Sequence, residues 1–151
     1  MKYDKEYFIS KGYNFRRDIR RFYPLALTLK FLGVKRVLDL RCAYGALVYV
    51  LRKLGVEAWG IDISEWARNV SPVKKYIILG DLNKDSIPFD DEYFDCITAI
   101  NFFEHIKNLN HCMKECYRVL RRNGLLYASI PSYSEDTLKD PYHVSVFPLK
   151  V

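Results

Sequence analysis

The stretch VLDLRCAYGALVYVLRKLG, residues 37–55, decides the fold class of this chain. A short apolar strand pattern at 35–40 leads into a turn with small residues at Ala43 and Gly45. A helical pattern follows from 46 to 54 and is ended by a glycine. The stretch therefore predicts a strand, a tight turn and a helix, in that order.

The same alternation continues along the chain. Further strands are expected at 57–63, 76–79, 94–100 and 125–130, and a short helix at 65–69 after the capping residue Ser64. The last helix presents one apolar face before a stop at Asn123 and Gly124, and that face carries Leu109, Cys112, Met113, Cys116 and Leu120. Strands that alternate with helices predict an α/β fold with a parallel sheet and right-handed crossovers.

Both ends of the chain lie outside this alternation. Residues 1–33 are expected to form a helical cap with Pro24 as the first residue of its helix, and the cap is rich in aromatic side chains. Those side chains are Tyr3, Tyr7, Phe8, Tyr13 and Phe15. Residues 132–151 form a C-terminal segment in which 143–147 (HVSVF) have the pattern of one short strand. The length of 151 residues favours a single domain, 1–151, whose core is 34–131.

Composition bounds the class of protein. There is no signal-peptide pattern at the start and no run of about 18 apolar residues, so a soluble, cytoplasmic protein is expected. The net charge is +6, but the basic residues are spread along the chain, and a solvated surface is the default interpretation for Arg16, Arg17, Arg20, Arg21, Arg118, Arg121 and Arg122. The four cysteines are expected to be reduced. Cys112 and Cys116, beside His111, are interpreted as core positions rather than half of a metal site.

Polar residues at the predicted strand ends are the candidates for function. Ligands of parallel α/β sheets bind at the carboxyl ends of the strands, where the winding direction changes. Asp39 and the small residues of the following turn lie at such an end. Asp62 ends the second strand, about 20 residues beyond the turn, where a carboxylate can accept hydrogen bonds from ribose hydroxyls.

Five blocks of the sequence, in register, carry a more specific resemblance. They are VLDLRCAYGALVYVLRKLG (37–55), VEAWGIDIS (56–64), GDLN (80–83), IPFDDEYFDCITAINFFEH (87–105) and RVLRRNGLLYASIP (118–131). Together they resemble the successive blocks of class I S-adenosylmethionine-dependent methyltransferases. The resemblance implies a Rossmann-like three-layer αβα sandwich with a mainly parallel sheet in strand order 3-2-1-4-5, whose last hairpin is missing or shortened here.

The resemblance also implies which residues bind the cofactor, S-adenosylmethionine. The first block would hold its methionine part, the acid after the second strand its ribose, and the residues after the third strand its adenine, while the end of the fourth strand would line the methyl-transfer site. On this chain these positions are Asp39, Arg41, Ala43, Gly45, Asp62, Ile63, Gly80, Asp81, Leu82, Asn101 and Phe102.

The chain departs from the family at Arg41 and Ala43, where the family prefers glycine. The added methyl group of Ala43 is expected to be tolerated. The Arg41 side chain must turn away from the cofactor, or the backbone must avoid the positive φ that glycine permits. A third option is that Arg41 pairs with the cofactor carboxylate, to which its planar guanidinium is suited.

Three residues, Glu104, His105 and His143, are candidates for acid-base chemistry. Glu104 and His105 follow the fourth strand as a Glu-His pair does in many small-molecule methyltransferases, and a histidine can remove a proton from an acceptor hydroxyl. An equal alternative is that His105 fixes a loop or caps a helix. Asp140 and His143 resemble an Asp-x-x-His segment of relatives that methylate sugars or lipid-linked metabolites, although Asp-Pro also begins ordinary surface turns.

The function that follows is methyl transfer to a hydroxyl or carboxyl group of a small molecule, glycan or lipid precursor, with no metal expected. The aromatic N-terminal cap and the tail after Ile130 would close over the cofactor, exclude water and position the acceptor. Nucleic acid is permitted as an acceptor but not favoured, because Asn101 is not followed by the Pro-Pro-aromatic element of base-nitrogen methyltransferases; RNA or protein as acceptor remains an alternative. Binding of NAD is disfavoured because its three-glycine signature is absent.

A hypothesis of another class is a degenerate fold that serves as a non-catalytic binding or scaffold module. It is motivated by Arg41 and by the early end of the sequence after the fifth strand. If 143–147 add no strand, the fifth strand is an exposed edge through which a homodimer could form.

Overall fold

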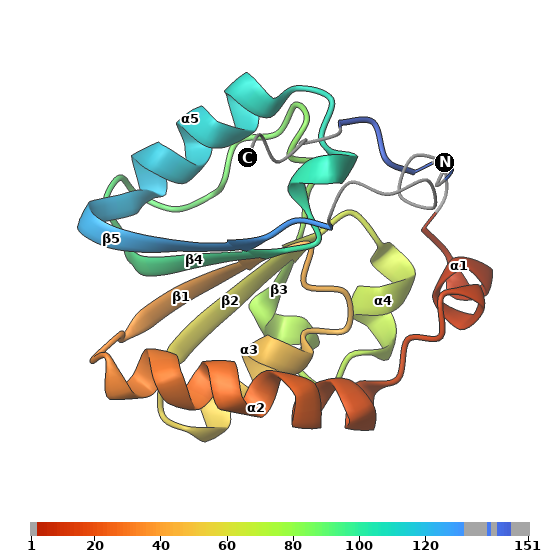
Figure 1. Ribbon diagram of the computed structural model, residues 1–151, viewed down its shortest axis with the longest axis horizontal. Coiled ribbons are helices and arrows are strands. Elements are labelled where there is room, and N and C mark those ends of the chain that lie inside the picture. Colours follow the sequence, from red (N-terminus) through yellow and green to blue (C-terminus); the bar gives the residue numbers. More distant parts are fainter. Residues whose placement is uncertain (1–2, 132–138, 140–141, 146–151) are drawn as a thin grey trace, which may run out of the picture.

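The computed structural model describes residues 3–131, 139 and 142–145, and a five-stranded sheet with helices on both faces forms its centre (Figure 1). The strands are β1 (Arg36–Leu40), β2 (Glu57–Asp62), β3 (Ile77–Leu79), β4 (Phe94–Ile100) and β5 (Leu120–Ser129). All neighbouring strands are parallel, in the order β3-β2-β1-β4-β5. The predicted α/β class and strand order are confirmed.

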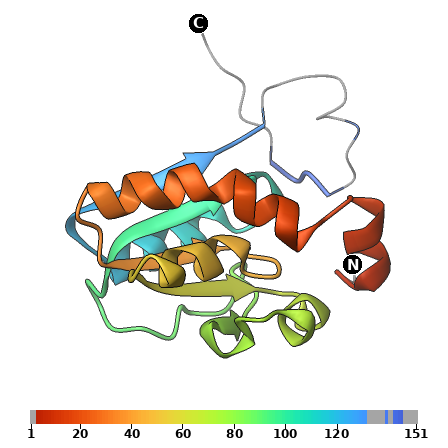
Figure 2. The same cartoon turned by 90° about the horizontal axis from the view of Figure 1, so that it is seen from below.

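The helices form the two outer layers. They are α1 (Lys5–Ser10), α2 (Phe15–Phe31), α3 (Ala46–Lys53), α4 (Glu65–Val70) and α5 (Leu109–Val119), with short 3-10 turns η1 (Lys74–Tyr76) and η2 (Phe103–His105). Helix α5 covers one face of the sheet, and α2 and α3 lie side by side under the other (Figures 1 and 2).

Strand β1 shows why the sheet is central. Its residues from Val37 to Leu40 are buried, and their side chains alternate between the two layers. Val37 packs into the cluster beneath α2 and α3, whereas Leu38 and Leu40 pack into the cluster beneath α5. A strand that is apolar on both faces requires helices on both sides, as parallel sheets generally do.

Helix α2 differs from the prediction, because Pro24 lies inside it rather than at its start. The helix begins after Asn14, whose side chain accepts a hydrogen bond from the backbone N–H of Arg17. Proline removes one backbone hydrogen bond, but the apolar stripe that includes Ala26 and Leu29 packs against the core on α3. Tertiary packing therefore outweighs the local cost of proline.

The boundary between α5 and β5 also differs. The helix ends at Val119, and the strand begins at Leu120, which pairs with Phe94 before a register shift. The predicted stop at Asn123 and Gly124 is wrong, since both lie within β5. Of the predicted apolar face, Cys112 and Cys116 are buried, whereas Met113 is 38% exposed. All four cysteines are free and buried, as their interpretation as core positions requires.

Strand β5 is the outer edge of the described sheet, and it is poorly covered. Its apolar side chains Leu125, Leu126 and Tyr127 remain about 40% exposed. Residues 143–145 form no strand, while 146–147 lie outside the described residues. The exposed edge agrees with the prediction, and homodimer formation through it stays a prediction.

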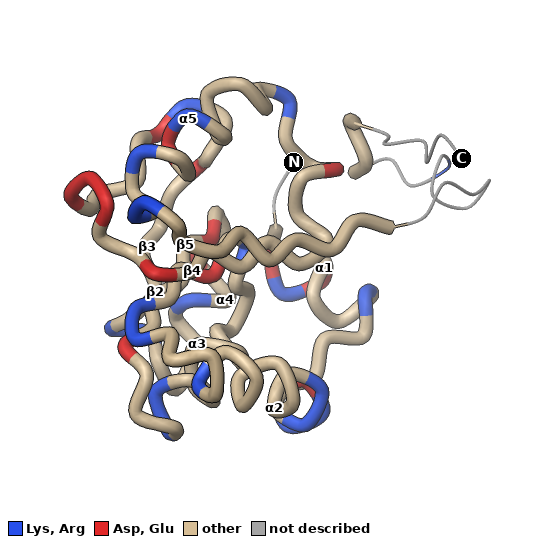
Figure 3. The backbone as a smooth tube through the Cα atoms, turned by 60° about the vertical axis from the view of Figure 1, so that its left-hand side comes forward, with Lys and Arg blue, Asp and Glu red and all other residues tan. Residues whose placement is uncertain are grey.

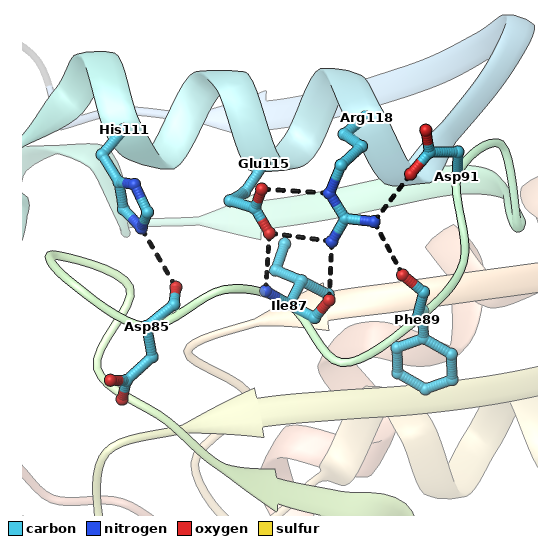
Figure 4. Close-up of polar contacts among 7 residues, drawn as sticks. All are labelled: Asp85, Ile87, Phe89, Asp91, His111, Glu115 and Arg118. Atoms are coloured by element: carbon cyan, nitrogen blue, oxygen red, sulfur yellow. Dashed lines mark hydrogen bonds and ion pairs between the residues drawn. The ribbon is translucent and has the colours of Figure 1, made fainter.

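The connection between β3 and β4 is fastened to α5 by one arginine (Figure 4). Arg118 donates hydrogen bonds to the backbone carbonyls of Ile87 and Phe89 and forms ion pairs with Asp91 and Glu115. Glu115 in turn accepts a hydrogen bond from the backbone N–H of Ile87.

Within the described part of the chain, no helix is both long and apolar enough to cross a bilayer.

Candidate functional site

Two adjoining cavities open at the carboxyl ends of the strands. The larger, about 360 Å³, is lined by the β1 turn, the N-terminal cap and the end of β4. The smaller, about 60 Å³, lies over the ends of β2 and β3. Arg41 and His105 line both, so they stand where the cavities meet.

The two cavities divide the sequence-predicted residues between them. The larger is lined by Asp39, Arg41, Ala43, Asn101, Glu104, His105 and His143. The smaller is lined by Asp62, Ile63, Gly80, Asp81, Leu82 and Phe102. Gly45 lies in neither wall; it is buried behind the turn, where an added Cβ would lie 2.8 Å from Val73 Cγ2. With that exception, the structure brings the predicted residues to one edge of the sheet.

The turn after β1 keeps a glycine-like backbone without glycine at its first positions. Arg41 has φ +57° and Ala43 has φ +50°, followed by Gly45 at φ +72°. A residue with a side chain in this left-handed region is strained by roughly 1–3 kcal/mol. The backbone at Arg41 therefore keeps the positive φ of a glycine, and the side chain remains in the crevice.

The guanidinium of Arg41 spans the crevice. It donates hydrogen bonds to the backbone carbonyl of Asn101, at 3.1 Å, and to the hydroxyl of Tyr7 in α1, at 2.7 Å. It also lies 5.7 Å from the ring centre of Tyr3. Burial lowers the pKa of Arg41, but nearby tyrosines and Asp62 outweigh this and the pKa is raised, so the group is a cation. Helix α1 and the β1 turn are thus joined through this cation.

The carboxylate of Asp62 is held rigidly at the end of β2. One oxygen accepts a hydrogen bond from the backbone N–H of Ala43 and the other from that of Ser64, both at 2.8 Å. The residue is 4% exposed, and burial raises the pKa of its carboxyl group although these hydrogen bonds and Arg41 oppose the shift. The clamp fixes the direction of the carboxylate toward the smaller cavity.

Asp39 lies deeper in the wall of the larger cavity. Its carboxylate accepts a 2.6 Å hydrogen bond from the hydroxyl of Thr98 on β4. Burial raises the pKa of Asp39 to about 7, against the lowering effect of Thr98. Asp39 can therefore change its charge near neutral pH.

The loop after β3 is organised by its own side chains. The Asp81 carboxylate accepts hydrogen bonds from the backbone and side-chain N–H groups of Asn83. The side-chain oxygen of Asn83 accepts from the backbone N–H groups of Lys107 and Asn108. Asp81 thus has a structural role in this loop in addition to its place in the cavity wall.

Glu104, His105 and His143 form one cluster beside the junction of the cavities. Nδ1 of His105 lies 2.8 Å from the carbonyl oxygen of Tyr142, and because a carbonyl only accepts, Nδ1 carries a proton. Nε2 of His105 lies 3.8 Å from Oε1 of Glu104, which is 2% exposed. The backbone N–H groups of Val144 and Ser145 donate to the carbonyl of Glu104 and bring His143 to the site. Asp140 lies outside the described residues.

The side chains of this cluster could also hold a metal ion. One potential ligand atom from each of Glu104, His105 and His143 lies within 4.8 Å of the others. Two imidazoles and a carboxylate suit several divalent transition metals. Sequence reasoning expected no metal and did not identify this possibility, since His143 is distant in the sequence.

Sequence reasoning also missed part of the wall of the larger cavity. Lys11, Arg17 and Arg21 line it from the N-terminal cap, with Asp18, Phe22 and Tyr44 beside them. The only signal available was the four-residue spacing of Arg17 and Arg21, which places both on one side of a helix. The predicted closing aromatic residues Tyr7 and Tyr13 do line this cavity.

The sequence profile of the methyltransferase domain family matches residues 38–128. The chain is 31% identical over 124 residues to a ubiquinone biosynthesis O-methyltransferase of Bradyrhizobium diazoefficiens. This alignment covers 78% of this chain and 48% of that protein. It is 30% identical over 105 residues to the protein of the same name from Glaesserella parasuis, and this alignment covers 63% of this chain and 44% of that protein. The chain thus spans about half the length of these curated relatives.

Solved structures show the same fold. A SAM-dependent methyltransferase from Archaeoglobus fulgidus superimposes with a TM-score of 0.77 at 21% identity, over 96% of this chain and 69% of that one. The PH0226 protein from Pyrococcus horikoshii superimposes with a TM-score of 0.61 at 30% identity, over 83% and 66% of the two chains.

Proposed function

Since this chain belongs to the methyltransferase domain family, we propose that it transfers the methyl group of S-adenosylmethionine to a hydroxyl or carboxyl group of a small molecule. One observation carries the proposal: the rigid carboxylate of Asp62, the cation of Arg41 and the His105 cluster lie along one continuous crevice. The names of the relatives, O-methyltransferases of ubiquinone biosynthesis, support a small-molecule acceptor.

The residues of the crevice suit the two ends of this cofactor. Asp62 presents a carboxylate to the smaller cavity, where ribose hydroxyls would donate to it. Arg41 stands at the junction, where its guanidinium would pair with the carboxylate of the methionine part. Ile63 and Leu82 provide apolar surface for the adenine beside Gly80 and Asp81.

His105 is proposed as the base that activates a hydroxyl acceptor. The carbonyl of Tyr142 holds the proton on Nδ1, so Nε2 carries the lone pair that accepts the acceptor's proton. Glu104, 3.8 Å away, stabilises the imidazolium that forms. The cofactor, when bound, would supply an electrophilic methyl carbon to the acceptor oxygen whose proton His105 takes, with the cofactor's sulfur as the leaving group.

Calorimetry with S-adenosylhomocysteine tests the cofactor site. The wild-type chain should bind it, and Asp62→Ala should weaken binding about 100-fold, because two charge-assisted hydrogen bonds are lost. Asp90→Asn, a change in an exposed turn, is the control and should bind as the wild type does. Absence of heat with the folded wild-type chain would refute the proposal.

Methyl transfer from a radiolabelled cofactor to a panel of small hydroxyl and carboxyl compounds tests the reaction. His105→Gln should lower kcat about 100-fold, the usual contribution of a general base, while leaving cofactor affinity unchanged. A chelator separates the two uses of the cluster. Activity that survives the chelator supports His105 as the base, whereas activity lost with the chelator and restored by a divalent ion contradicts that role and favours metal binding by Glu104, His105 and His143.

A non-catalytic binding module is the second candidate, and one observation favours it. With Arg41 spanning the crevice and Tyr3 beside it, the smaller cavity is only about 60 Å³, so these side chains must shift before an adenosine enters. The calorimetric experiment decides between the two candidates.

A further inference from the structure

The wall of the larger cavity is unusually rich in cations. Lys11, Arg17 and Arg21 come from the N-terminal cap, and Arg41 comes from the β1 turn. Figure 3 shows blue basic positions on α2. Arg17 and Arg21, which line the cavity, belong to this helix. Lys11, Arg17 and Arg21 are themselves exposed, so the cavity opens to solvent on this side. Several cations around one open cavity favour an anionic ligand, because their fields add.

The acids in the same wall cancel only part of this positive charge, because Asp18 pairs with Arg17 alone. Asp18 is 7% exposed and lies 3.5 Å from Nε of its neighbour Arg17. Asp39 is held by Thr98, and its pKa is raised to about 7 by burial, so at neutral pH it carries only part of a charge. Glu104 faces Nε2 of His105. Among the described residues, neither Arg21 nor Arg41 forms an ion pair with a carboxylate, and the wall retains positive charge.

Arg17 and Arg21 are placed to act together. They lie one helical turn apart on α2, so their side chains project from the same side of the helix. Arg17 is positioned by a hydrogen bond to the carbonyl of Gly12, and Arg21 lies 5.6 Å from the ring centre of Phe22. Two guanidinium groups so arranged can bind one oxyanion through several charge-assisted hydrogen bonds.

Binding of the proposed cofactor does not require Arg17 and Arg21. It has one carboxylate, and Arg41 at the junction of the cavities is assigned to it. We therefore propose that the methyl acceptor itself carries an oxyanion, a carboxylate or a phosphate, that Arg17 and Arg21 bind. This inference rests on the proposed function, which it narrows to acidic small molecules.

Helix α2 offers a matched control. Arg16 and Arg20 are exposed, belong to the same helix and do not line the cavity. The pair Arg17→Gln with Arg21→Gln and the pair Arg16→Gln with Arg20→Gln remove the same charge. Only an effect at the cavity distinguishes them.

The experiment is calorimetry with benzoate, phenyl phosphate and benzamide, on the chain saturated with S-adenosylhomocysteine. One or both anions should bind at least about tenfold more tightly than the neutral benzamide, and the tighter anion identifies the oxyanion. Substitution of Arg17 and Arg21 together should lower the affinity for that anion at least about tenfold. Substitution of Arg16 and Arg20 together should lower it less than about twofold. Arg21→Gln alone, which removes a contact with the Phe22 ring but no hydrogen bond among the described residues, should reproduce part of the loss if the double variant proves unstable.

Three outcomes overturn the inference. Equal binding of benzoate, phenyl phosphate and benzamide would show that no oxyanion is recognised. Equal losses in the two double variants would show only a long-range effect of net charge. A loss of S-adenosylhomocysteine affinity in the Arg17 and Arg21 pair would assign these arginines to the cofactor instead. If the wild type binds an anion through Arg17 and Arg21 but does not bind S-adenosylhomocysteine, the proposed function fails while the anion site stands.

Discussion

Arg118 and Arg41 are both partly buried arginines that join separate parts of the chain, but their charges are used differently. Arg118 lies 2.8–2.9 Å from the carboxylates of Glu115 and Asp91 and also binds two backbone carbonyls. Arg41 binds a carbonyl and a phenol, and it forms no ion pair with a carboxylate among the described residues. The first cation is neutralised by the protein itself; the second remains available to an anion.

The difference separates a structural arginine from a candidate binding arginine. Burial of a cation is costly unless partners compensate for the lost hydration. Arg118 has those partners on the α5 side of the sheet. Arg41 is only partly compensated in the crevice, so an arriving carboxylate would stabilise it.

The largest effect is expected from breaking the Arg118 network. Arg118→Met should lower the free energy of unfolding by about 1–3 kcal/mol, because Glu115 and the carbonyls of Ile87 and Phe89 lose their donor. Thermal unfolding should show a Tm lower by roughly 5 °C, with unchanged affinity for S-adenosylhomocysteine. Arg122→Met, at an exposed position of β5, is the control; equal shifts in both variants would contradict the structural role.

Replacing Arg41 by glycine tests whether this second arginine contributes to cofactor binding. Arg41→Gly should lower the affinity for S-adenosylhomocysteine about tenfold, since a charge-assisted contact with its carboxylate is lost. Two effects on its stability oppose each other, because glycine relieves the positive φ while the hydrogen bonds to Tyr7 and Asn101 are lost. Ala43→Gly relieves the same kind of strain without removing charge, so its affinity should stay at the wild-type value. Tighter binding in Arg41→Gly would mean that Arg41 obstructs the crevice.

The smallest effect concerns Asp39, the acid beneath the crevice. Its pKa in the folded protein, about 7, lies above its ordinary value of 3.8, so the folded state retains a proton that the unfolded chain releases. The resulting stabilisation is full below pH 3.8 and is lost as the pH rises through 7. Asp39→Asn removes this dependence, so the Tm of the wild type should fall relative to that of the variant as the pH rises from 5 to 8. Parallel Tm profiles of the two proteins from pH 5 to pH 8 would contradict the assignment.

The part of the fold that could be predicted from the sequence depends on local patterns. The β1 strand, its turn and α3 follow from an apolar run, small residues and helical spacing, and all three lie within a residue or two of their expected positions. The spacing of Asp62 from the turn likewise placed it at the edge of the sheet beside Ala43, to whose backbone it is hydrogen-bonded.

The features that could not be predicted depend on contacts between segments that are distant in the sequence. Pro24 signalled a helix start, but the helix begins earlier, at Phe15, and Ile19 and Phe22 of the added part pack against the same core. Leu120 continued the helical spacing, yet its pairing with Phe94 makes it a strand residue. Arg17 and Arg21 resembled a solvated surface, because the sequence alone does not state which side of α2 faces the crevice.

Strand β5 has a consequence for amide hydrogen exchange. It pairs with β4 along one side, and no described strand lies along the other. Because successive N–H groups of a strand point to opposite sides, every second amide of β5 is bonded to β4 and its neighbours face outward. Exchange along β5 should therefore alternate between slow and fast from one residue to the next, whereas β1, which has partners on both sides, should exchange slowly at every position.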